Sequence, residues 1–319
     1  MEKSKIIVIV GPTASGKTDL SLRLARQLNG EIITADSRTL YRGMNIGTAK
    51  PEGHQASSAG TQFRNWKISD LFVQQPFMVK DIPHWGIDII NPDEPFSVAD
   101  FKAYADERIA DIISREQLPI IVGGTGLYVN AVIDNWSLTE VKENAELRKE
   151  LEKLSDERLI LRLELADRDA VETVDTANRR RLIRAIEIVE TTGKTLAENQ
   201  NKGECKYEVL MLGMKIDREL LYERIDYRVD KMIAEGLVDE VRGLKNTYGC
   251  EINAMTGIGY RQICAFLDGY LKLRDAIELL KRDTRHYAKR QLTWFKRDAR
   301  IHWISEYEEV NKLLKKFFA

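Results

Sequence analysis

The sequence contains few cysteines. Among 319 residues it has Cys205, Cys250 and Cys264, and no two of them form a CxxC pair. Their odd number and wide spacing indicate neither a disulfide framework nor a zinc site. We therefore expect reduced thiols, as in a cytoplasmic protein.

Long hydrophobic runs are also lacking. The apolar run near the start, Ile6 to Val10, is far shorter than the roughly 18 residues that cross a bilayer. Lys3 and Lys5 precede it, as basic residues do in a signal peptide, but Gly11-Pro12 follows at once. This pattern favours a strand and a turn, and we expect no membrane association.

Nor does one sign of charge dominate. Lys and Arg total 49 and Asp and Glu total 50, so the formal net charge is −1. That balance by itself argues against a nucleic-acid binder. However, basic residues gather in two segments, from Lys281 to Trp303 and from Arg179 to Arg184. Local patches of this kind, rather than net charge, decide where a polyanion binds.

What is present is the composition of a globular protein. Hydrophobic residues make up 43% of the sequence and charged residues 31%, which excludes wholesale disorder and collagen-like structure. The length fits about two domains.

Short β-branched runs alternate with segments of helical period, as in parallel βαβ units. Strands are expected at residues 5–10, 31–35, 86–90, 118–122 and 207–214. Helices are expected at residues 18–28, 97–115 with Ser97 as N-cap, 178–190, 218–244 and 273–296. Residues 51–78 have no clear period and are expected to form a loop.

A helical insertion interrupts this pattern. Residues 140–165 are heavily charged, with Leu147, Leu151 and Leu154 at helical spacing. We therefore predict an α/β fold with a P-loop NTPase-like parallel sheet core flanked by helices. Residues 1–137 and 200–319 form this core, and residues 138–199 form an inserted, mainly helical domain.

The clearest motif is a phosphate-binding loop. Residues 11–18 match GxxxxGK[ST] between an expected strand and an expected helix. Backbone amides of such a loop turn toward an anion, Lys17 adds a charge, and the Thr18 hydroxyl suits Mg²⁺. The predicted phosphate-binding residues are Gly11, Pro12, Thr13, Ala14, Ser15, Gly16, Lys17 and Thr18. The usual interpretation is a nucleoside triphosphatase or kinase.

One expected strand lacks the carboxylate of such enzymes. Residues 118–122 lead into Gly-Gly-Thr, where a Walker-B strand ends in Asp, which argues against ATP hydrolysis. Asp36 follows a neighbouring strand instead. Because ligands bind outside the carboxyl ends of parallel strands, we expect Asp36, Thr125 and the phosphate loop to converge on one crevice. Asp36 is then a candidate general base, and a turn cap is the alternative.

Six segments together resemble bacterial tRNA dimethylallyltransferases, and the resemblance covers almost the whole chain. They are residues 11–18 (GPTASGKT), 36–44 (DSRTLYRGM), 46–50 (IGTAK), 123–128 (GGTGLY), 180–184 (RRLIR) and 287–294 (YAKRQLTW). The resemblance implies transfer of a dimethylallyl group from dimethylallyl diphosphate to N6 of the adenosine immediately 3′ of the anticodon. It also implies that the phosphate loop holds the diphosphate leaving group rather than ATP.

The same resemblance implies roles for individual residues. Asp36, Lys17 and Thr125 are the implied catalytic residues, with Asp36 as base and with Lys17 and Mg²⁺ stabilising the departing diphosphate. The implied tRNA contacts are Asp36, Ser37, Arg38, Thr39, Thr125, Arg148, Arg180, Arg181, Leu182, Ile183 and Arg184. Arg224 and Arg228, four apart on one helix face, are candidate diphosphate partners. For Arg224, exposed pairing with neighbouring carboxylates is an equal alternative.

The basic segment near residue 290 has two helical stripes. One consists of Leu280, Thr284, Tyr287, Gln291 and Trp294, and the other of Arg282, Arg285, Lys289 and Lys296. The first stripe is expected to face the core. A solvated face is the simple interpretation of the second, but its unbalanced charge favours phosphate contact. Arg285 and Lys289 are therefore predicted to bind tRNA.

Two features depart from the family pattern. The chain is longer between Pro51 and Pro83, and Asp36-Ser-Arg-Thr replaces the more familiar Asp-Ser-Met-Gln, which affects readout of the bases flanking the target.

Three alternatives remain: a P-loop nucleotide kinase, an isopentenyltransferase acting on free adenine nucleotides, and a non-catalytic RNA-binding module. The basic segments argue against the first two, and intact Lys17, Thr18 and Asp36 argue against the third. We expect a cytoplasmic monomer that binds dimethylallyl diphosphate and the tRNA anticodon stem-loop, whose target base leaves the stack.

Overall fold

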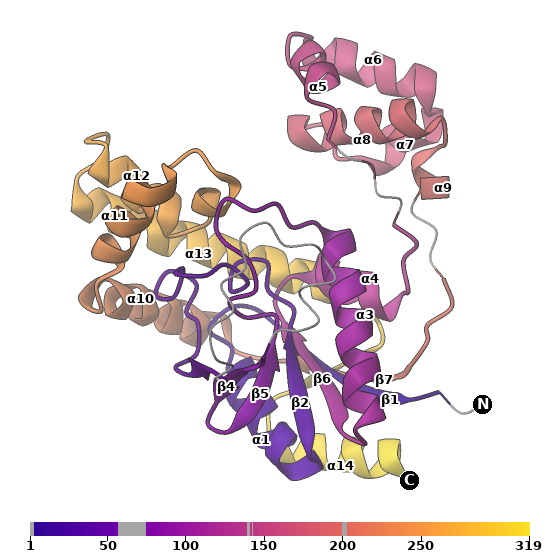
Figure 1. The fold of residues 1–319 in the computed structure, drawn as a ribbon, viewed down its shortest axis with the longest axis vertical. Coiled ribbons are helices and arrows are strands. Elements are labelled where there is room, and N and C mark those ends of the chain that lie inside the picture. Colours follow the sequence, from indigo (N-terminus) through magenta and orange to yellow (C-terminus); the bar gives the residue numbers. More distant parts are fainter. Residues whose placement is uncertain (1–2, 57–74, 139–140, 142, 200–202) are drawn as a thin grey trace. The chain divides into compact units, whose positions relative to one another are not determined.

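The computed structural model describes residues 3–56, 75–138, 141, 143–199 and 203–319. The chain divides into two compact units, one formed by residues 1–133 with 206–319 and the other by residues 134–205. The first is α/β and the second is helical (Figure 1). Among the described residues, no helix is long and apolar enough to cross a membrane.

A sheet of eight strands forms the centre of the α/β unit, counted over the residues that are described. Its order is β3 (His54–Gln55), β4 (Phe77–Val79), β5 (Ile82–Trp85), β2 (Gly30–Thr34), β6 (Leu118–Gly123), β1 (Lys5–Val10), β7 (Glu208–Met214) and β8 (Ile301–Ile304). The β3–β4 and β4–β5 pairs are antiparallel and the other pairs are parallel. The predicted fold class, a mostly parallel sheet flanked by helices, is confirmed.

Helices cover both faces of the sheet because successive side chains of each strand point to opposite sides. Ile6, Val8 and Val10 of β1 pack with α3 (Val98–Ser114) and α4 (Gly126–Ile133). Ile7 and Ile9 pack with α1 (Lys17–Leu28) and α14 (Tyr307–Phe318) on the other face. All five residues are fully buried.

The predicted N-cap of α3 is confirmed, whereas the strand predicted just before it is wrong. Ser97 accepts a hydrogen bond from the Asp100 amide at 3.2 Å, and Asp100 accepts one from the Ser97 amide at 2.7 Å. The strand expected at residues 86–90 lies earlier, as β5. Gly86, with φ of 82°, ends that strand because its backbone turns into the left-handed region.

The single helix predicted at residues 218–244 is also wrong. The structure has two helices, α10 (Arg218–Ala234) and α11 (Leu237–Tyr248). Gly236, with φ of 99°, separates them, and an isolated glycine is a weak stop signal in a sequence. A short 3-10 helix η1 (Asn253–Thr256), α12 (Tyr260–Leu267) and α13 (Leu273–Phe295) follow.

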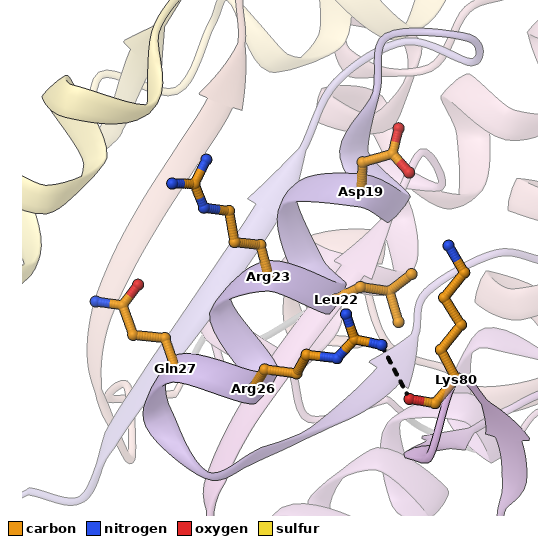
Figure 2. Close-up of a pocket in the computed structure, with 6 residues that line it drawn as sticks. All are labelled: Asp19, Leu22, Arg23, Arg26, Gln27 and Lys80. Carbon is orange, nitrogen blue, oxygen red and sulfur yellow. Dashed lines mark hydrogen bonds between the residues drawn. The ribbon is translucent and has the colours of Figure 1, made fainter.

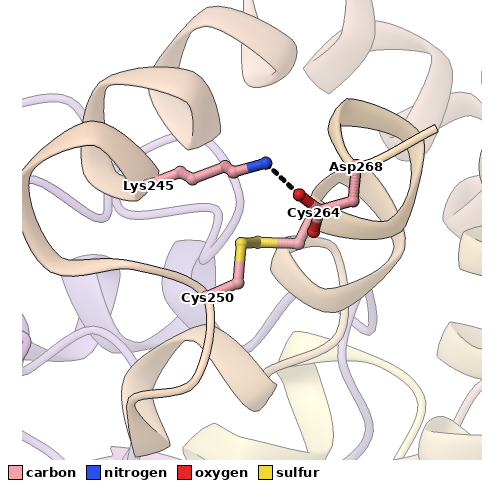
Figure 3. The surroundings of a disulfide bond; sticks show 4 residues. All are labelled: Lys245, Cys250, Cys264 and Asp268. Atoms are coloured by element: carbon pink, nitrogen blue, oxygen red, sulfur yellow. Dashed lines mark hydrogen bonds and ion pairs between the residues drawn. A yellow bond between two sulfur atoms is a disulfide. The ribbon is translucent and has the colours of Figure 1, made fainter. Parts of the chain in front are cut away.

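Two cysteines form a disulfide, so the expectation of reduced thiols is wrong for Cys250 and Cys264. Cys250 follows α11 and Cys264 lies in α12, and η1 folds the chain between them so that their sulfurs meet (Figure 3). Lys245 and Asp268 form an ion pair beside the disulfide. Cys205 is not part of this disulfide.

The helical unit has a core of its own. Its helices are α5 (Ala145–Leu151), α6 (Asp156–Ala166), α7 (Arg168–Thr173), α8 (Arg179–Thr192) and α9 (Leu196–Asn199). Leu151, Leu159, Leu182 and Ile186 are fully buried against one another. The charged stretch at residues 140–165 thus contains two helices, and the side chain of Ser155 caps the second.

The stretch expected to be a loop, residues 51–78, lies only partly within the described residues. Its two ends are short strands, because β3 pairs with β4. The loop expectation is wrong for these ends, and residues 57–74 lie outside the described part of the chain.

Candidate functional site

The phosphate loop joins β1 to α1 and is built to receive an anion. Gly16 occupies the N-cap position of α1 with φ of 92°, and no side chain caps the helix there. The first amides of α1 are therefore available to an anionic group, which the helix dipole also favours. Ser15 is 4% exposed, and its hydroxyl is buried with no hydrogen-bond partner among the described residues. A buried hydroxyl of this kind is typical of a site that a ligand completes.

Two cations lie at this loop. Lys17 donates a hydrogen bond from Nζ to the carbonyl of Pro12 at 2.6 Å, and burial lowers the pKa of its amine to about 7. The charge of Asp36 opposes this shift and the charge of Arg228 adds to it. Arg228 of α10 donates to the hydroxyl of Thr13 at 3.1 Å, and burial lowers its pKa as well. Two partly desolvated cations at one loop indicate an anionic ligand.

Gln291 of α13 holds the phosphate loop through hydrogen bonds, a role that its sequence pattern did not predict. Its side-chain oxygen accepts from the Thr13 amide at 2.8 Å, and its side-chain nitrogen donates to the carbonyl of Gly124 at 3.0 Å. Gln291 is 6% exposed, so the predicted inward face is confirmed for it. Its position four residues after Tyr287 was the signal that both side chains share one helix face.

Asp36 and Thr125 come together where β2 and β6 end. The hydroxyl of Thr125 accepts from the Ser37 amide at 3.1 Å, and the Thr125 amide donates to the carbonyl of Ala35 at 3.2 Å. Gly123 permits this approach, because an added Cβ would lie 2.0 Å from the Ala35 carbonyl oxygen. The expected convergence of Asp36, Thr125 and Lys17 is therefore present.

The carboxylate of Asp36 also stabilises the turn that follows it. Its Oδ1 accepts from the Arg38 amide at 2.8 Å, as in an Asx turn. Burial and the Asp36 charge raise the pKa values of Tyr128 and Tyr287, and Tyr287 hydrogen bonds with Thr125. Two protonated phenols thus lie near this carboxylate. The turn-cap role does not exclude a base role, since a carboxylate has a second oxygen.

Arg38 is anchored within the protein. It donates from Nη1 to the carbonyls of Asn253 at 2.9 Å and Ala254 at 3.1 Å, both in η1. Thr39 is 6% exposed, and no partner for its buried hydroxyl lies in the part of the chain that the structure describes. The guanidinium of Arg38 therefore fixes η1 beside the Asp36 turn.

Most arginines predicted to contact tRNA from the helical unit pair with carboxylates. Arg148 and Arg184 each bind the fully buried carboxylate of Glu187, and Arg148 lies 2.8 Å from its Oε2. Burial raises the pKa of Glu187, but the hydrogen bonds from both arginines outweigh this and hold that pKa below its usual value. Arg181 pairs with Asp175 at 3.2 Å, and Arg180 is exposed. The side chains of the other two predicted residues, Leu182 and Ile183, are buried in the core of this unit.

The basic stripe of α13 is partly neutralised. Arg285 donates to both oxygens of Asp226, at 2.6 and 2.7 Å, whereas Lys289 is exposed. Trp294, expected to face the core, is 39% exposed, so that expectation is wrong for it. Phe295 takes the buried position, because the 3.6-residue period moves the inward stripe by one residue along a long helix. Arg224 is exposed.

The described residues contain no group of three His, Cys, Asp or Glu side chains that could hold a metal. A Mg²⁺ ion bound through substrate phosphates and one hydroxyl needs no such group. Thr18, exposed at the start of α1 next to Lys17, fits that arrangement.

A surface hollow of about 530 Å³ lies elsewhere, on the outer side of α1 (Figure 2). Its lining residues are Asp19, Leu22, Arg23, Arg26, Gln27 and Lys80. Lys17, Thr18 and Asp36 do not line it, so the hollow is separate from the candidate site.

Comparisons with known proteins agree on one family. The family model described as IPP transferase matches residues 39–298. The chain is 42% identical to a tRNA dimethylallyltransferase of Alkaliphilus oremlandii, across 98% of this chain and 95% of the relative. It is 38% identical to the tRNA dimethylallyltransferase of Bacillus subtilis, with the same coverage of both chains.

Solved structures are similar as well. A full-length tRNA isopentenylpyrophosphate transferase from Bacillus halodurans matches with a TM-score of 0.68 at 38% identity, across 99% of this chain and 96% of that one. A eukaryotic dimethylallyltransferase acting on tRNA matches with a TM-score of 0.73 at 30% identity. That match covers 91% of this chain and 69% of the eukaryotic chain.

Proposed function

The chain belongs to the IPP transferase family, and from this premise and the geometry of the site we propose the reaction that it catalyses. It is a tRNA dimethylallyltransferase, and the group transferred is the dimethylallyl moiety of dimethylallyl diphosphate. The acceptor that we propose is N6 of the adenosine immediately 3′ of the anticodon. The observation that carries the proposal is an anion-binding loop with two desolvated cations, Lys17 and Arg228, close enough to Asp36 for its charge to act on Lys17.

The donor diphosphate binds at the phosphate loop. The amides at the start of α1, the unpartnered hydroxyl of Ser15, and the side chains of Lys17 and Arg228 are its proposed ligands. Thr18 is the proposed ligand of Mg²⁺, which would neutralise charge that develops on the departing diphosphate. Binding of the diphosphate restores the charged form of Lys17 by placing an anion beside it.

Transfer breaks the bond between C1 of the dimethylallyl group and a diphosphate oxygen, and forms a bond between C1 and adenine N6. The electron pair of the broken bond leaves with the diphosphate, where Lys17 and the loop amides stabilise it. The proton of the amine passes to Asp36. Thr125, through the Ser37 amide, holds the turn that carries this carboxylate. The neutral phenol of Tyr287 lies on the same side of the site.

The proposed tRNA contacts follow exposure. Arg180 and Lys289 are exposed and suit contacts to phosphate oxygens, and the half-buried Ser37 suits the acceptor side. Thr39 is buried, so its proposed part is to shape the turn after Asp36. Arg148, Arg184 and Arg285 are already paired with carboxylates, so their main contribution is to hold the elements that carry the contacts. Arg181 pairs with Asp175 only at the surface, and its 63% exposed side chain is kept as a proposed phosphate contact. A monomer in the cytoplasm, where tRNA is found, completes the proposal.

A labelled-donor assay tests the function. The protein is incubated with labelled dimethylallyl diphosphate, or with labelled ATP as a rival substrate, and with either an anticodon stem-loop or AMP. We expect label from the prenyl donor in the stem-loop. Label in AMP, or phosphoryl transfer from ATP, would replace the proposed acceptor and reaction.

A further inference from the structure

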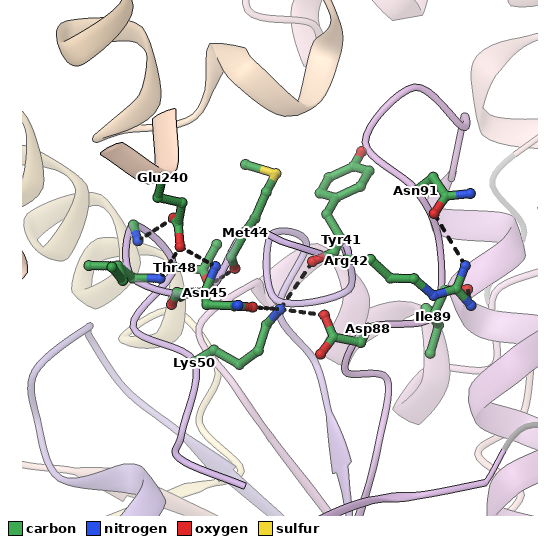
Figure 4. A network of polar contacts seen from close by, with 12 residues as sticks. Tyr41, Arg42, Met44, Asn45, Thr48, Lys50, Asp88, Ile89, Asn91 and Glu240 are labelled. Atoms are coloured by element: carbon green, nitrogen blue, oxygen red, sulfur yellow. Dashed lines mark hydrogen bonds and ion pairs between the residues drawn. The ribbon is translucent and has the colours of Figure 1, made fainter. Parts of the chain in front are cut away.

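One motif singled out in the sequence has no part in the reaction described above. Residues 46–50 (IGTAK) are separated by Asn45 alone from the segment 36–44 that starts at Asp36. The backbone from Tyr41 to Lys50 forms turns rather than a helix or strand. Its shape must therefore come from contacts with other elements, which Figure 4 shows.

The main contact is with Glu240 of α11. Its Oε2 accepts from the amides of Asn45 at 2.9 Å and Ile46 at 2.7 Å, and its Oε1 accepts from the amide of Gly47 at 3.0 Å. Consecutive amides that converge on one anion form a nest, a geometry that proteins commonly use for phosphate. In this protein, the occupant is a carboxylate from an element 193 to 195 residues away in sequence.

Tyr260 of α12 holds the same carboxylate in place. Its hydroxyl donates to Oε1 of Glu240 at 2.7 Å, and its side chain is 1% exposed. Burial and the charge of Glu240 raise the pKa of Tyr260 well above 10, so its hydroxyl stays a donor. Its ring lies against Gly47, where an added Cβ would come within 2.6 Å of ring atoms.

Lys50 closes the segment at its other end. Its ammonium donates to the carbonyl of Tyr41 at 3.1 Å and to Oδ1 of Asn45 at 2.7 Å, and it pairs with Asp88. The side chain is 3% exposed, and burial lowers its pKa while the charge of Asp88 opposes that shift. Two charges of opposite sign, the half-buried Glu240 and the buried ammonium of Lys50, thus fix one irregular loop.

We infer that Glu240 is a positioning residue for the tRNA side of the reaction. Glu240 binds the amides of residues 45–47, and Lys50 holds the rest of the turns between residues 41 and 50. Together these contacts fix the segment that begins at Asp36, so that residues 36–39 are presented to the acceptor. The inference rests on the proposed function, since that function assigns these residues to the acceptor. The donor side depends on other contacts, namely those of Lys17, Arg228 and Gln291.

The test compares Glu240→Gln with Asp239→Asn, its neighbour on α11. Each change removes one negative charge. Asp239 has a side chain 79% exposed and pairs only at the surface with Arg242. In Glu240→Gln, an amide nitrogen replaces one acceptor oxygen and faces backbone N–H groups. Single-turnover transfer at saturating donor is measured against anticodon stem-loop concentration, and binding of dimethylallyl diphosphate is measured alone.

We expect Glu240→Gln to raise the stem-loop concentration at half-maximal rate by about tenfold or more, because charge-assisted hydrogen bonds to three consecutive loop amides are weakened or lost. Donor affinity should change by less than about twofold, and Asp239→Asn should match the parent protein in both measurements. Parent-like stem-loop dependence in Glu240→Gln overturns the inference. Equal losses of donor and stem-loop affinity also overturn it, since they indicate general damage.

Tyr260→Phe gives a second test in case Glu240→Gln does not fold. It removes one hydrogen bond to Glu240 and leaves the ring on Gly47, so a smaller rise in the half-maximal stem-loop concentration is expected, with unchanged donor affinity. No change in Tyr260→Phe, together with an unfolded Glu240→Gln, would assign Glu240 to stability alone and overturn the inference. A parent protein that fails to label the stem-loop contradicts the proposed function instead, and the same assay reports this separately.

Discussion

The side-chain oxygen of Gln291 accepts a hydrogen bond from the backbone amide of Thr13 at 2.8 Å, although 278 residues separate them in the sequence. The side-chain nitrogen of the same residue donates to Gly124 at 3.0 Å. One side chain of α13 therefore links the phosphate loop with the turn that carries Thr125. Movement of either loop would break a buried hydrogen bond.

Gln291→Leu keeps the approximate volume and removes both hydrogen bonds. The free energy of unfolding should fall by about 1–3 kcal/mol, since a buried carbonyl, that of Gly124, and a half-buried amide, that of Thr13, lose their partner. The donor should bind more weakly because the loop is no longer braced. Denaturant unfolding and donor titration measure the two effects. Thr293→Ala, an exposed change on the same helix, is the control, and parent-like donor affinity in Gln291→Leu would contradict the bracing role.

Donor binding should draw a proton from solution above neutral pH. Burial lowers the pKa of Lys17 to about 7, so its amine is largely neutral at pH 8, and the bound diphosphate favours the charged form. At pH 6 the amine is already protonated and no uptake is expected at this residue. Calorimetric titration at pH 8 in two buffers with different heats of ionisation measures the uptake.

Lys17→Arg is the control, because its guanidinium stays charged at both pH values and should remove the uptake. Equal uptake in the parent and Lys17→Arg would assign the proton to another group. In the ligand-free protein, the contribution of Lys17 to the free energy of unfolding should increase as the pH rises from about 7 to 10.5. The unfolded chain binds a proton in that window that folded Lys17 lacks.

Asp36→Asn separates the proposed base role of this residue from its role in the turn. In the parent protein the Arg38 amide lies 2.8 Å from Oδ1 of Asp36. The side-chain oxygen of asparagine can still accept this hydrogen bond, so the turn should persist. Loss of the base should slow single-turnover transfer by roughly 10²–10⁴-fold, with donor binding retained. Lys17→Ala should instead weaken donor binding and transfer together. Transfer at the parent rate in Asp36→Asn would leave that residue as a turn cap.

Two arginines of α8 should behave differently although both lie in the RRLIR motif. Arg180 is exposed, so Arg180→Ala should weaken tRNA binding and reduce its salt slope by about one unit without changing stability. Arg184→Ala leaves the fully buried Glu187 short of one partner and should destabilise the helical unit. Binding across a salt series and thermal unfolding distinguish the two. An unchanged slope in Arg180→Ala would remove Arg180 from the tRNA interface.

The disulfide gives a simple chemical prediction. Thiol titration of the denatured protein should find one reactive thiol, that of Cys205, before reduction and three afterwards. Three reactive thiols before reduction would show that Cys250 and Cys264 are not joined in the purified protein. Alkylation under non-reducing conditions followed by mass measurement checks the count.

Local patterns predicted the parts of the site that lie at strand ends. The phosphate loop is one continuous motif, and the rule for parallel sheets placed Asp36 and Thr125 together because β2 and β6 are neighbours. The break at Gly236 was missed because residues on both sides keep helical periodicity. The disulfide was missed because its geometry depends on how η1 folds the chain.

Long-range polar contacts could not be predicted from single segments. Glu240 looks like any acidic residue on an amphipathic helix, and its amide partners lie far away in the sequence. Glu187 likewise gave no signal that its carboxylate is fully buried between Arg148 and Arg184. A sequence pattern can thus predict an exposed charged side chain that in the structure binds a distant loop. Its partners are known only once the fold is known.

The order of strands in the sheet has a consequence for the synthesis of this chain. β1 lies between β6 and β7, with Val8 opposite both Ile121 and Met211. Residues 134–205 are synthesised after β6 and before β7. One edge of β1 therefore stays unpaired until residues 208–214 have left the ribosome. Open edges of this kind pair readily with other chains. This edge of β1 is therefore exposed for as long as the helical unit is being translated.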